Sequence, residues 1–195
     1  KRAFRLSTNV RPTKYDIDLS SDPSRSDFSG SVRIFATVEQ ATSSIVLHSR
    51  ELALREASIK AQGQTLPATI SLQPDQETVT LSTASPIPSG TIEIAVRFAG
   101  KLAPSMHGIY LATDGVHRAV CTQCEATDAR AIFPCFDEPE FKAVLKWTLH
   151  TAPNLTALSN GPEDQRHEAK AADGTTEQVV AFKPTRPVSS YLAAV

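Results

Sequence analysis

The clearest structural signal in the chain is residues 92–98, IEIAVRF, in which apolar side chains occupy every second position. Successive side chains of a β-strand point to opposite faces. The four apolar residues therefore share one face, whereas Glu93 and Arg97 lie on the other. This alternation predicts a half-buried strand rather than a helix.

Working outward from this stretch, the same period of two recurs in short segments separated by turn dipeptides such as Ser89-Gly90 and Asp173-Gly174. A sustained helical period is missing, and only residues 127–136 are compatible with a helical turn. We therefore predict an all-β fold, either an antiparallel sandwich or a system of curved sheets, as one domain over residues 1–195. Further strands are expected at residues 15–19, 32–38, 45–47, 79–81, 144–149, 179–182 and 190–195.

Bulk composition excludes several classes of protein. The 195 residues are 41% hydrophobic and 21% charged, with a net charge of -1, so neither a nucleic-acid partner nor an anionic membrane is indicated. No apolar stretch is long enough to cross a membrane as a helix. The three cysteines form no disulfide framework, which favours a reducing, cytoplasmic location. Because the chain starts at Lys1 and ends in an apolar run, we expect it to be part of a longer protein.

The densest group of reactive side chains is residues 121–139, CTQCEATDARAIFPCFDEP. Cys121 and Cys124 have the spacing of a redox or zinc pair, but an all-β setting lacks the helix of a thioredoxin-like site and no second pair is present. We interpret both as structural thiols. The five histidines form no HExxH motif, so we expect no metal ligands and no catalytic residues in these 195 residues.

Gln123 and Glu125 are candidate substrate-binding residues. On a strand, two residues that are two apart project to the same side. A carboxylate beside an amide suits a free α-ammonium group, because both offer oxygen acceptors to its N–H groups. The alternative is that both are solvated edge residues, or that Glu125 pairs with Arg130.

The sequence resembles the N-terminal domain of zinc aminopeptidases of the aminopeptidase N family. Residues 122–130, TQCEATDAR, are similar to the family signature TQ-x-E-x-T-x-AR, and residues 133–143 are similar to its FPC-x-DEP-x-x-KA continuation. Weaker similarities run in order along nearly the whole chain, from Pro12 to Ser190-Tyr191-Leu192-Ala193, which resembles the closing strand of the domain. The sequence departs from the pattern at Ala131, where a second arginine is usual, and at Val188, where methionine is usual.

The resemblance implies a saddle-like β domain that packs on a separate catalytic domain holding the zinc ion. By this carry-over, Glu125 binds the α-amino group of a peptide with a free N-terminus, and Gln123 shapes the pocket for its first side chain. The full-length enzyme then removes N-terminal residues from peptides, whereas this chain alone is inactive. Arg130, Asp137 and Glu138 are interpreted as structural residues.

The competing hypothesis is a non-enzymatic relative that uses the same β domain as a protein-binding scaffold. A carbohydrate-binding sandwich is disfavoured, because the chain has one tryptophan and three tyrosines.

Overall fold

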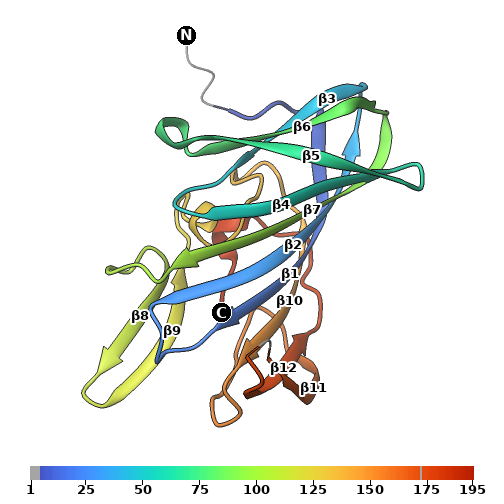
Figure 1. Ribbon diagram of the computed structural model, residues 1–195. Helices are drawn as coiled ribbons and strands as arrows, with labels where there is room; N and C mark the ends of the chain where they lie inside the picture. Colours follow the sequence, from blue (N-terminus) through green and yellow to red (C-terminus); the bar gives the residue numbers. More distant parts are fainter. Residues whose placement is uncertain (1–4, 172) are drawn as a thin grey trace.

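The computed structural model describes residues 5–171 and 173–195, and almost all of its regular structure is β (Figure 1). No α-helix occurs in the described ranges, which hold only three short 3-10 turns. The all-β prediction is therefore confirmed. The strands are β1 (Val10–Ser21), β2 (Asp27–Val38), β3 (Thr42–His48), β4 (Ala53–Ala61), β5 (Gln64–Gln73), β6 (Thr78–Ile87), β7 (Gly90–Lys101), β8 (Gly108–Asp114), β9 (His117–Gln123), β10 (Val144–Thr151), β11 (Glu163–Lys170) and β12 (Thr176–Phe182), and the 3-10 turns are η1 (Pro74–Gln76), η2 (Ala129–Ala131) and η3 (Ser190–Leu192).

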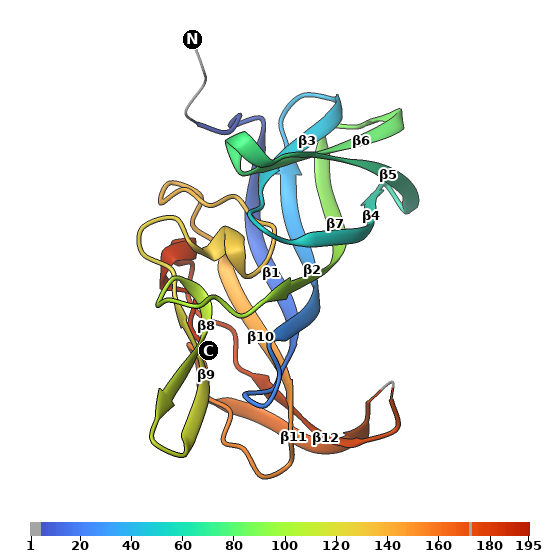
Figure 2. The same ribbon diagram turned by 60° about the vertical axis from the view of Figure 1, so that its left-hand side comes forward.

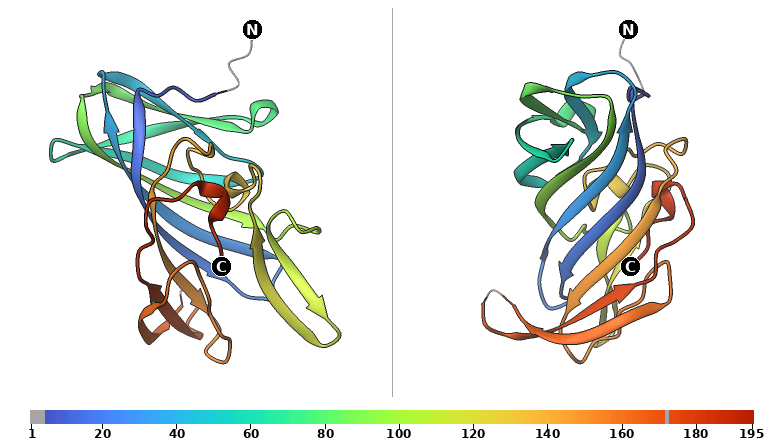
Figure 3. Two further views of the ribbon diagram at one scale, coloured as in Figure 1. Left: turned by 180° about the vertical axis from the view of Figure 1, so that it is seen from behind. Right: turned by 90° about the vertical axis from the view of Figure 1, so that its right-hand side faces the viewer.

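Ten strands form one continuous sheet in the order β11-β12-β10-β1-β2-β7-β4-β5-β6-β3. The sheet is strongly twisted and curved, as the two views in Figure 3 show. Neighbouring strands of the sheet are antiparallel, except that β1 and β10 run parallel. β8 and β9 form a separate hairpin outside this sheet. The expected curved architecture is thus present, with one parallel pair that the strand pattern does not reveal.

The sheet turns a corner within β5. Residues 64–67 pair with β4, whereas residues 68–73 pair with β6. Pro67 stands where the pairing changes, which suits a residue that cannot donate to a central ladder. Beyond the corner, buried side chains of β3 and β6 join those of β2, β4 and β7 in one hydrophobic cluster that includes Ile34, Ile59 and Leu81. Burying each such side chain stabilises the fold by roughly 1.5–3 kcal/mol.

A second part of the same core lies under the segment that follows β9. Phe133 packs edge-on against Tyr15 of β1, with ring centroids 5.8 Å apart, and against Trp147 of β10, at 5.7 Å. All three rings are almost completely buried. The aromatic cluster fixes residues 124–143 to the core face of β1 and β10, and so holds the reactive stretch in a defined place on the sheet.

Local predictions near the ends of this segment have mixed outcomes. A helical turn is confirmed by η2, which lies inside the expected range 127–136. The strand predicted over residues 190–195 is wrong, because Ser190–Leu192 form the 3-10 turn η3 and the residues after it pair with no strand. The apolar run of residues 191–195 favoured a strand, but the structure buries Ser190 and Ala193 at a turn, without strand pairing. Within the described ranges, the structure offers no helix of the length and apolarity that a membrane span requires.

Candidate functional site

The β8–β9 hairpin carries Gln123 at the last position of β9, directly opposite Gly108 at the first position of β8. Figure 2 shows the hairpin standing apart from the ten-stranded sheet. Two glycines shape it. Gly115 has φ +58 in the two-residue loop, as a type II′ hairpin turn requires. Gly108 has φ +65, and a Cβ there would lie 2.9 Å from the Cβ of Ala131. The base of the hairpin therefore packs tightly against η2.

Glu125 lies just beyond β9, in a turn that leads to η2. The turn is closed by the backbone N–H of Asp128, which donates to the carbonyl of Cys124 over 2.9 Å. The expectation that Glu125 continues the strand beside Gln123 is thus wrong, because β9 ends at Gln123. The two residues are nevertheless brought together, since the backbone N–H of Glu125 donates to Oε1 of Gln123 over 3.0 Å.

Both candidate side chains are exposed, whereas Cys124 between them is buried. The Sγ of Cys124 donates to the carbonyl of Ala193 over 3.3 Å, and the hydroxyl of Thr122 accepts the N–H of Val195 over 3.0 Å. The residues that follow η3 therefore pack against the end of β9. This backing leaves only the outward side of the segment open, and Gln123 and Glu125 lie on that side.

The Glu125 carboxylate forms no ion pair with any cationic side chain of residues 5–171 and 173–195. The alternative partner considered from the sequence, Arg130, is occupied elsewhere: its guanidinium contacts Glu77 at 3.0 Å and Asp137 at 2.9 Å. An exposed carboxylate without an internal partner is free to bind an external cation. The Oε1 of Gln123 retains a second lone pair beside it.

Asp128, three residues after Glu125, is held on two sides. Its Oδ1 accepts from Nη2 of Arg50 at 2.7 Å, and its Oδ2 lies 3.1 Å from Nδ1 of His107. Arg50 belongs to the segment that follows β3, and His107 directly precedes β8. The carboxylate thus joins three parts of the chain beside the candidate site.

Arg130 and Asp137 form a buried pair below the turn. The guanidinium donates through Nε to Oδ2 of Asp137 and through Nη2 to its carbonyl, at 2.9 and 3.2 Å. The other carboxylate oxygen accepts from the hydroxyl of Ser190 at 2.6 Å. Glu138 accepts the backbone N–H of Leu6 at 2.6 Å. These contacts agree with the interpretation of Arg130, Asp137 and Glu138 as structural residues.

His48 completes this buried network. Its Nδ1 accepts the backbone N–H of Asp137 over 3.2 Å. Burial, reinforced by the nearby positive charge of Arg130, lowers the pKa of His48 to about 4. The imidazole is therefore neutral near pH 7, as an acceptor at Nδ1 requires.

The cysteines are all free. Burial raises the pKa of Cys124 to about 12 and that of Cys135 well above its ordinary value, with the charge of Asp137 adding to both. Thiols in this state are poor nucleophiles and poor metal ligands. The geometry supports the interpretation of Cys124 as a packing residue.

No group of three or more His, Cys, Asp or Glu side chains suited to a metal ion is found in the part of the chain that the structure describes. Three histidines illustrate why: His48 accepts from Asp137, His107 contacts Asp128, and His117 lies at the exposed end of the hairpin. These residues do not fit a zinc site.

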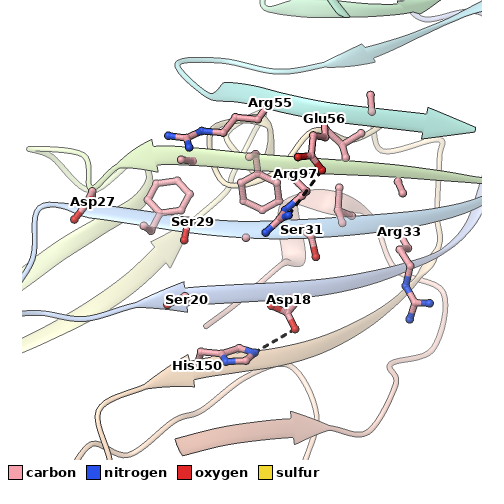
Figure 4. A pocket seen from close by; sticks show the side chains of 18 of the residues that line it. Asp18, Ser20, Asp27, Ser29, Ser31, Arg33, Arg55, Glu56, Arg97 and His150 are labelled. Atoms are coloured by element: carbon pink, nitrogen blue, oxygen red, sulfur yellow. Dashed lines mark hydrogen bonds and ion pairs between the residues drawn. The ribbon is translucent and has the colours of Figure 1, made fainter. Parts of the chain in front are cut away.

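A large open cleft of about 1190 Å³ lies elsewhere in the described part of the chain, on the face of the sheet opposite to the core (Figure 4). Its charged side chains largely compensate one another: Arg97 lies 3.8 Å from Glu56, and His150 contacts both Asp18 and Glu177. Arg55 and Lys170, which also line the cleft, have no ion-pair partner among the described residues, so the free charges of the cleft are positive and would repel an ammonium group. Size alone does not make it the functional site.

Comparison with known proteins shows the family to which this chain is similar. Residues 11–192 match the family described as the peptidase M1 N-terminal domain. The chain is 34% identical to aminopeptidase M1-D of Oryza sativa subsp. japonica over 195 residues, covering 98% of this chain and 22% of that protein. It is 34% identical to endoplasmic reticulum aminopeptidase 1 of Homo sapiens over 201 residues, covering 98% of this chain and 21% of that protein.

A third relative, the puromycin-sensitive aminopeptidase of Caenorhabditis elegans, is 31% identical over 197 residues, covering 97% of this chain and 20% of that protein. The chain thus spans about a fifth of the length of these curated relatives.

Proposed function

The chain belongs to the peptidase M1 N-terminal domain family, and from this premise we propose that it is the substrate-anchoring domain of a zinc-dependent aminopeptidase. Its relatives are named as aminopeptidases and are about five times as long. In this proposal the reaction partner is a peptide with a free N-terminus, and the second partner is the protein's own catalytic domain. In this proposal the catalytic domain holds the zinc ion, and the residues that the structure describes offer no ligand group for it.

The observation that carries the proposal is the unpaired Glu125 carboxylate beside Gln123 on a rigidly supported turn. Among the described residues, Glu125 has no competing cation, so an α-ammonium group would gain a charge-assisted hydrogen bond without breaking an existing ion pair. The Oε1 of Gln123, already fixed by the N–H of Glu125, would accept a second hydrogen bond from the same ammonium group.

Such an anchor explains selectivity for the first residue of a peptide. A carboxylate held at one place relative to the reacting centre brings only the bond next to the free amine into position. Acetylation of the amine removes its charge and leaves Glu125 buried against substrate without a partner, which costs binding free energy.

The test is the substitution Glu125→Gln in the full-length protein. The variant keeps the size of the side chain but loses its charge. We expect kcat/KM for an aminoacyl arylamide to fall about 100-fold, because breaking a charged hydrogen-bonded contact costs several kcal/mol. The matched control is Glu168→Gln, which removes an exposed carboxylate from β11 at the far edge of the sheet. Its kcat/KM should stay within twofold of the parent value.

Two outcomes would overturn the proposal. Unchanged kcat/KM in Glu125→Gln would remove Glu125 from the amine site. No hydrolysis by the folded, zinc-supplied parent protein would instead support the scaffold hypothesis, in which the same domain binds proteins without cleaving them.

A further inference from the structure

We propose that Asp128 is a positioning residue for Glu125: clamped by Arg50 and His107, it fixes the turn that presents the amine-binding carboxylate. This inference rests on the proposed function and adds to it a group that does not itself touch the substrate. It follows from the contacts that converge on one residue next to the exposed turn.

Asp128 closes the turn with its main chain and anchors it with its side chain. Its N–H donates to the carbonyl of Cys124 at 2.9 Å, and its own carbonyl accepts the N–H of Ala131 at 3.1 Å. Its two carboxylate oxygens contact different partners, Arg50 at 2.7 Å and His107 at 3.1 Å. The side chain is only 12% exposed, so water competes little for these contacts.

Arg50 is itself attached to the rigid part of the molecule. Its backbone N–H donates to the carbonyl of Arg130 at 2.9 Å, and its Nη1 lies 3.6 Å from Oε1 of Glu77. Glu77 in turn accepts a hydrogen bond from Nη1 of Arg130, and Arg130 also donates to Asp137. A continuous chain of charged contacts therefore runs from Asp128 to the buried core of the domain.

His107 ties the same carboxylate to the other side of the site. It directly precedes Gly108, which lies opposite Gln123 in the hairpin register. The backbone at Gly108 packs against Asp128 and Ala131, where a Cβ would lie 3.4 Å from the Asp128 carbonyl oxygen. Asp128 thus fixes the turn of Glu125 relative to the strand end of Gln123, and both halves of the candidate site depend on it.

Between these anchors, Glu125, Ala126 and Thr127 are exposed. Their position is set by the ends of the turn, at Cys124 and Asp128. Loosening one end would let the Glu125 carboxylate occupy many positions, and a misplaced binding group loses much of its effect. The loss should appear in the binding of the free amine and not in the chemistry that follows.

The experiment uses the full-length protein with the substitution Asp128→Asn, which retains shape and removes the charge that Arg50 binds. We expect KM for an aminoacyl arylamide to rise about tenfold while kcat changes less than threefold. The inhibition constant of a matched substrate analogue that lacks the α-amino group should stay within twofold. A merely structural role would weaken both ligands or lower kcat.

A double-mutant cycle with Glu125→Gln gives the decisive readout. If Asp128 acts through Glu125, the rise in KM caused by Asp128→Asn should disappear in the Glu125→Gln background. The matched control is Asp16→Asn, because Asp16 is also largely buried, at 17% side-chain exposure, and also has two cationic partners, Lys14 and Arg33. It lies on β1, and its KM should stay at the parent value.

The outcomes separate the two proposals. An effect of Glu125→Gln with no rise in KM for Asp128→Asn, or with fully additive losses in the double variant, would overturn the positioning role and leave the proposed function intact. No effect of Glu125→Gln would overturn the proposed function, and the positioning role with it.

Discussion

Two histidines of this domain, His48 and His150, both lie beside carboxylates, yet their pKa values move in opposite directions. His48 is buried next to the Arg130–Asp137 pair, and its pKa falls to about 4. His150 bridges Asp18 and Glu177 at 3.2 and 2.8 Å, and its hydrogen bond to Asp18 is the main reason that its pKa rises to about 9. A neighbouring carboxylate therefore does not decide the charge of a histidine. At His48, burial and the Arg130 guanidinium lower the pKa by more than the nearby carboxylate raises it. At His150, direct hydrogen bonds to two carboxylates raise the pKa by more than partial burial lowers it.

The two regions consequently hold their charges in different ways. Below the candidate site, charged groups are buried and fully paired, and the histidine is neutral. On the outer face of the sheet, the charged histidine joins β10 to β1 and β12 at the wall of the large cleft (Figure 4). The first arrangement gives a rigid platform, whereas the second is a surface contact that solvent weakens.

Removing one partner of the buried pair should have the largest effect on stability. In Asp137→Ala, the Arg130 guanidinium loses its main acceptor in a buried site, and the Ser190 hydroxyl loses its own. We expect the free energy of unfolding to fall by about 3–5 kcal/mol. Urea unfolding of the 195-residue chain, followed by the fluorescence of its single tryptophan, measures this. The exposed control Arg25→Gln, which breaks the surface pair with Asp27, should cost far less, because solvent screens that pair. Equal losses would show that the platform is no more rigid than the surface.

Acidification should lower the free energy of unfolding through the protonation of His48. Its pKa is about 4 in the folded chain, below the ordinary value of 6.5, so the folded state binds fewer protons. The contribution of this group to stability is then complete above pH 6.5 and is lost as the pH falls toward 4. We expect a loss of about 1–3 kcal/mol over this window, and a smaller loss in His48→Gln. Parallel pH profiles of the two proteins would contradict the buried neutral state.

Alkaline pH should lower the free energy of unfolding by a smaller amount, through the deprotonation of His150. Its folded pKa of about 9 lies above the ordinary 6.5, so its contribution is complete below pH 6.5 and is lost as the pH rises toward 9. Because the side chain is 22% exposed and Asp18 is 50% exposed, we expect no more than about 1 kcal/mol. The difference in unfolding free energy between the parent chain and His150→Gln, measured at pH 6 and pH 9.5, isolates it. A difference that grows with pH would reverse the assigned sign.

The fold was predictable where strands bury one face. Residues 92–98 alternate cleanly, residues 32–38 do so less strictly because Phe35 makes the second face partly apolar, and both lie in central strands. β11, EDQRHEAK, gives no such signal, because it is an edge strand whose side chains are almost all exposed. β4 and β5 were missed for a different reason: a bulge between Leu54 and Glu56 and the corner at Pro67 interrupt their alternation. Parallel pairing of β1 with β10 leaves no local pattern in either strand.

The sequence indicated that the two candidate residues lie together, but not the geometry that joins them. Gln123 and Glu125 are brought together, but by a hydrogen bond across a turn and not by a shared strand face. Arg130 pairs with Asp137 and Glu77 and not with Glu125, the alternative that the sequence left open. No pattern in the sequence pointed to Arg50 and Glu77. Arg50 lies 78 positions from its partner Asp128, and Glu77 lies 53 positions from its partner Arg130, so no local spacing indicates these contacts. Gly115, at the first central position of the hairpin turn, was the available signal for the hairpin.

The parallel seam between β1 and β10 has a consequence for how the chain folds. Asp18 and His150, which meet across it, are 132 positions apart. During synthesis, β2 can pair with one edge of β1 early, while the other edge stays open until β10 has emerged. Throughout that interval the strand of Tyr15, Ile17 and Leu19 offers unpaired backbone groups next to apolar side chains. The nascent chain is most vulnerable to pairing with another molecule at this edge, and the arrival of β10 ends the exposure.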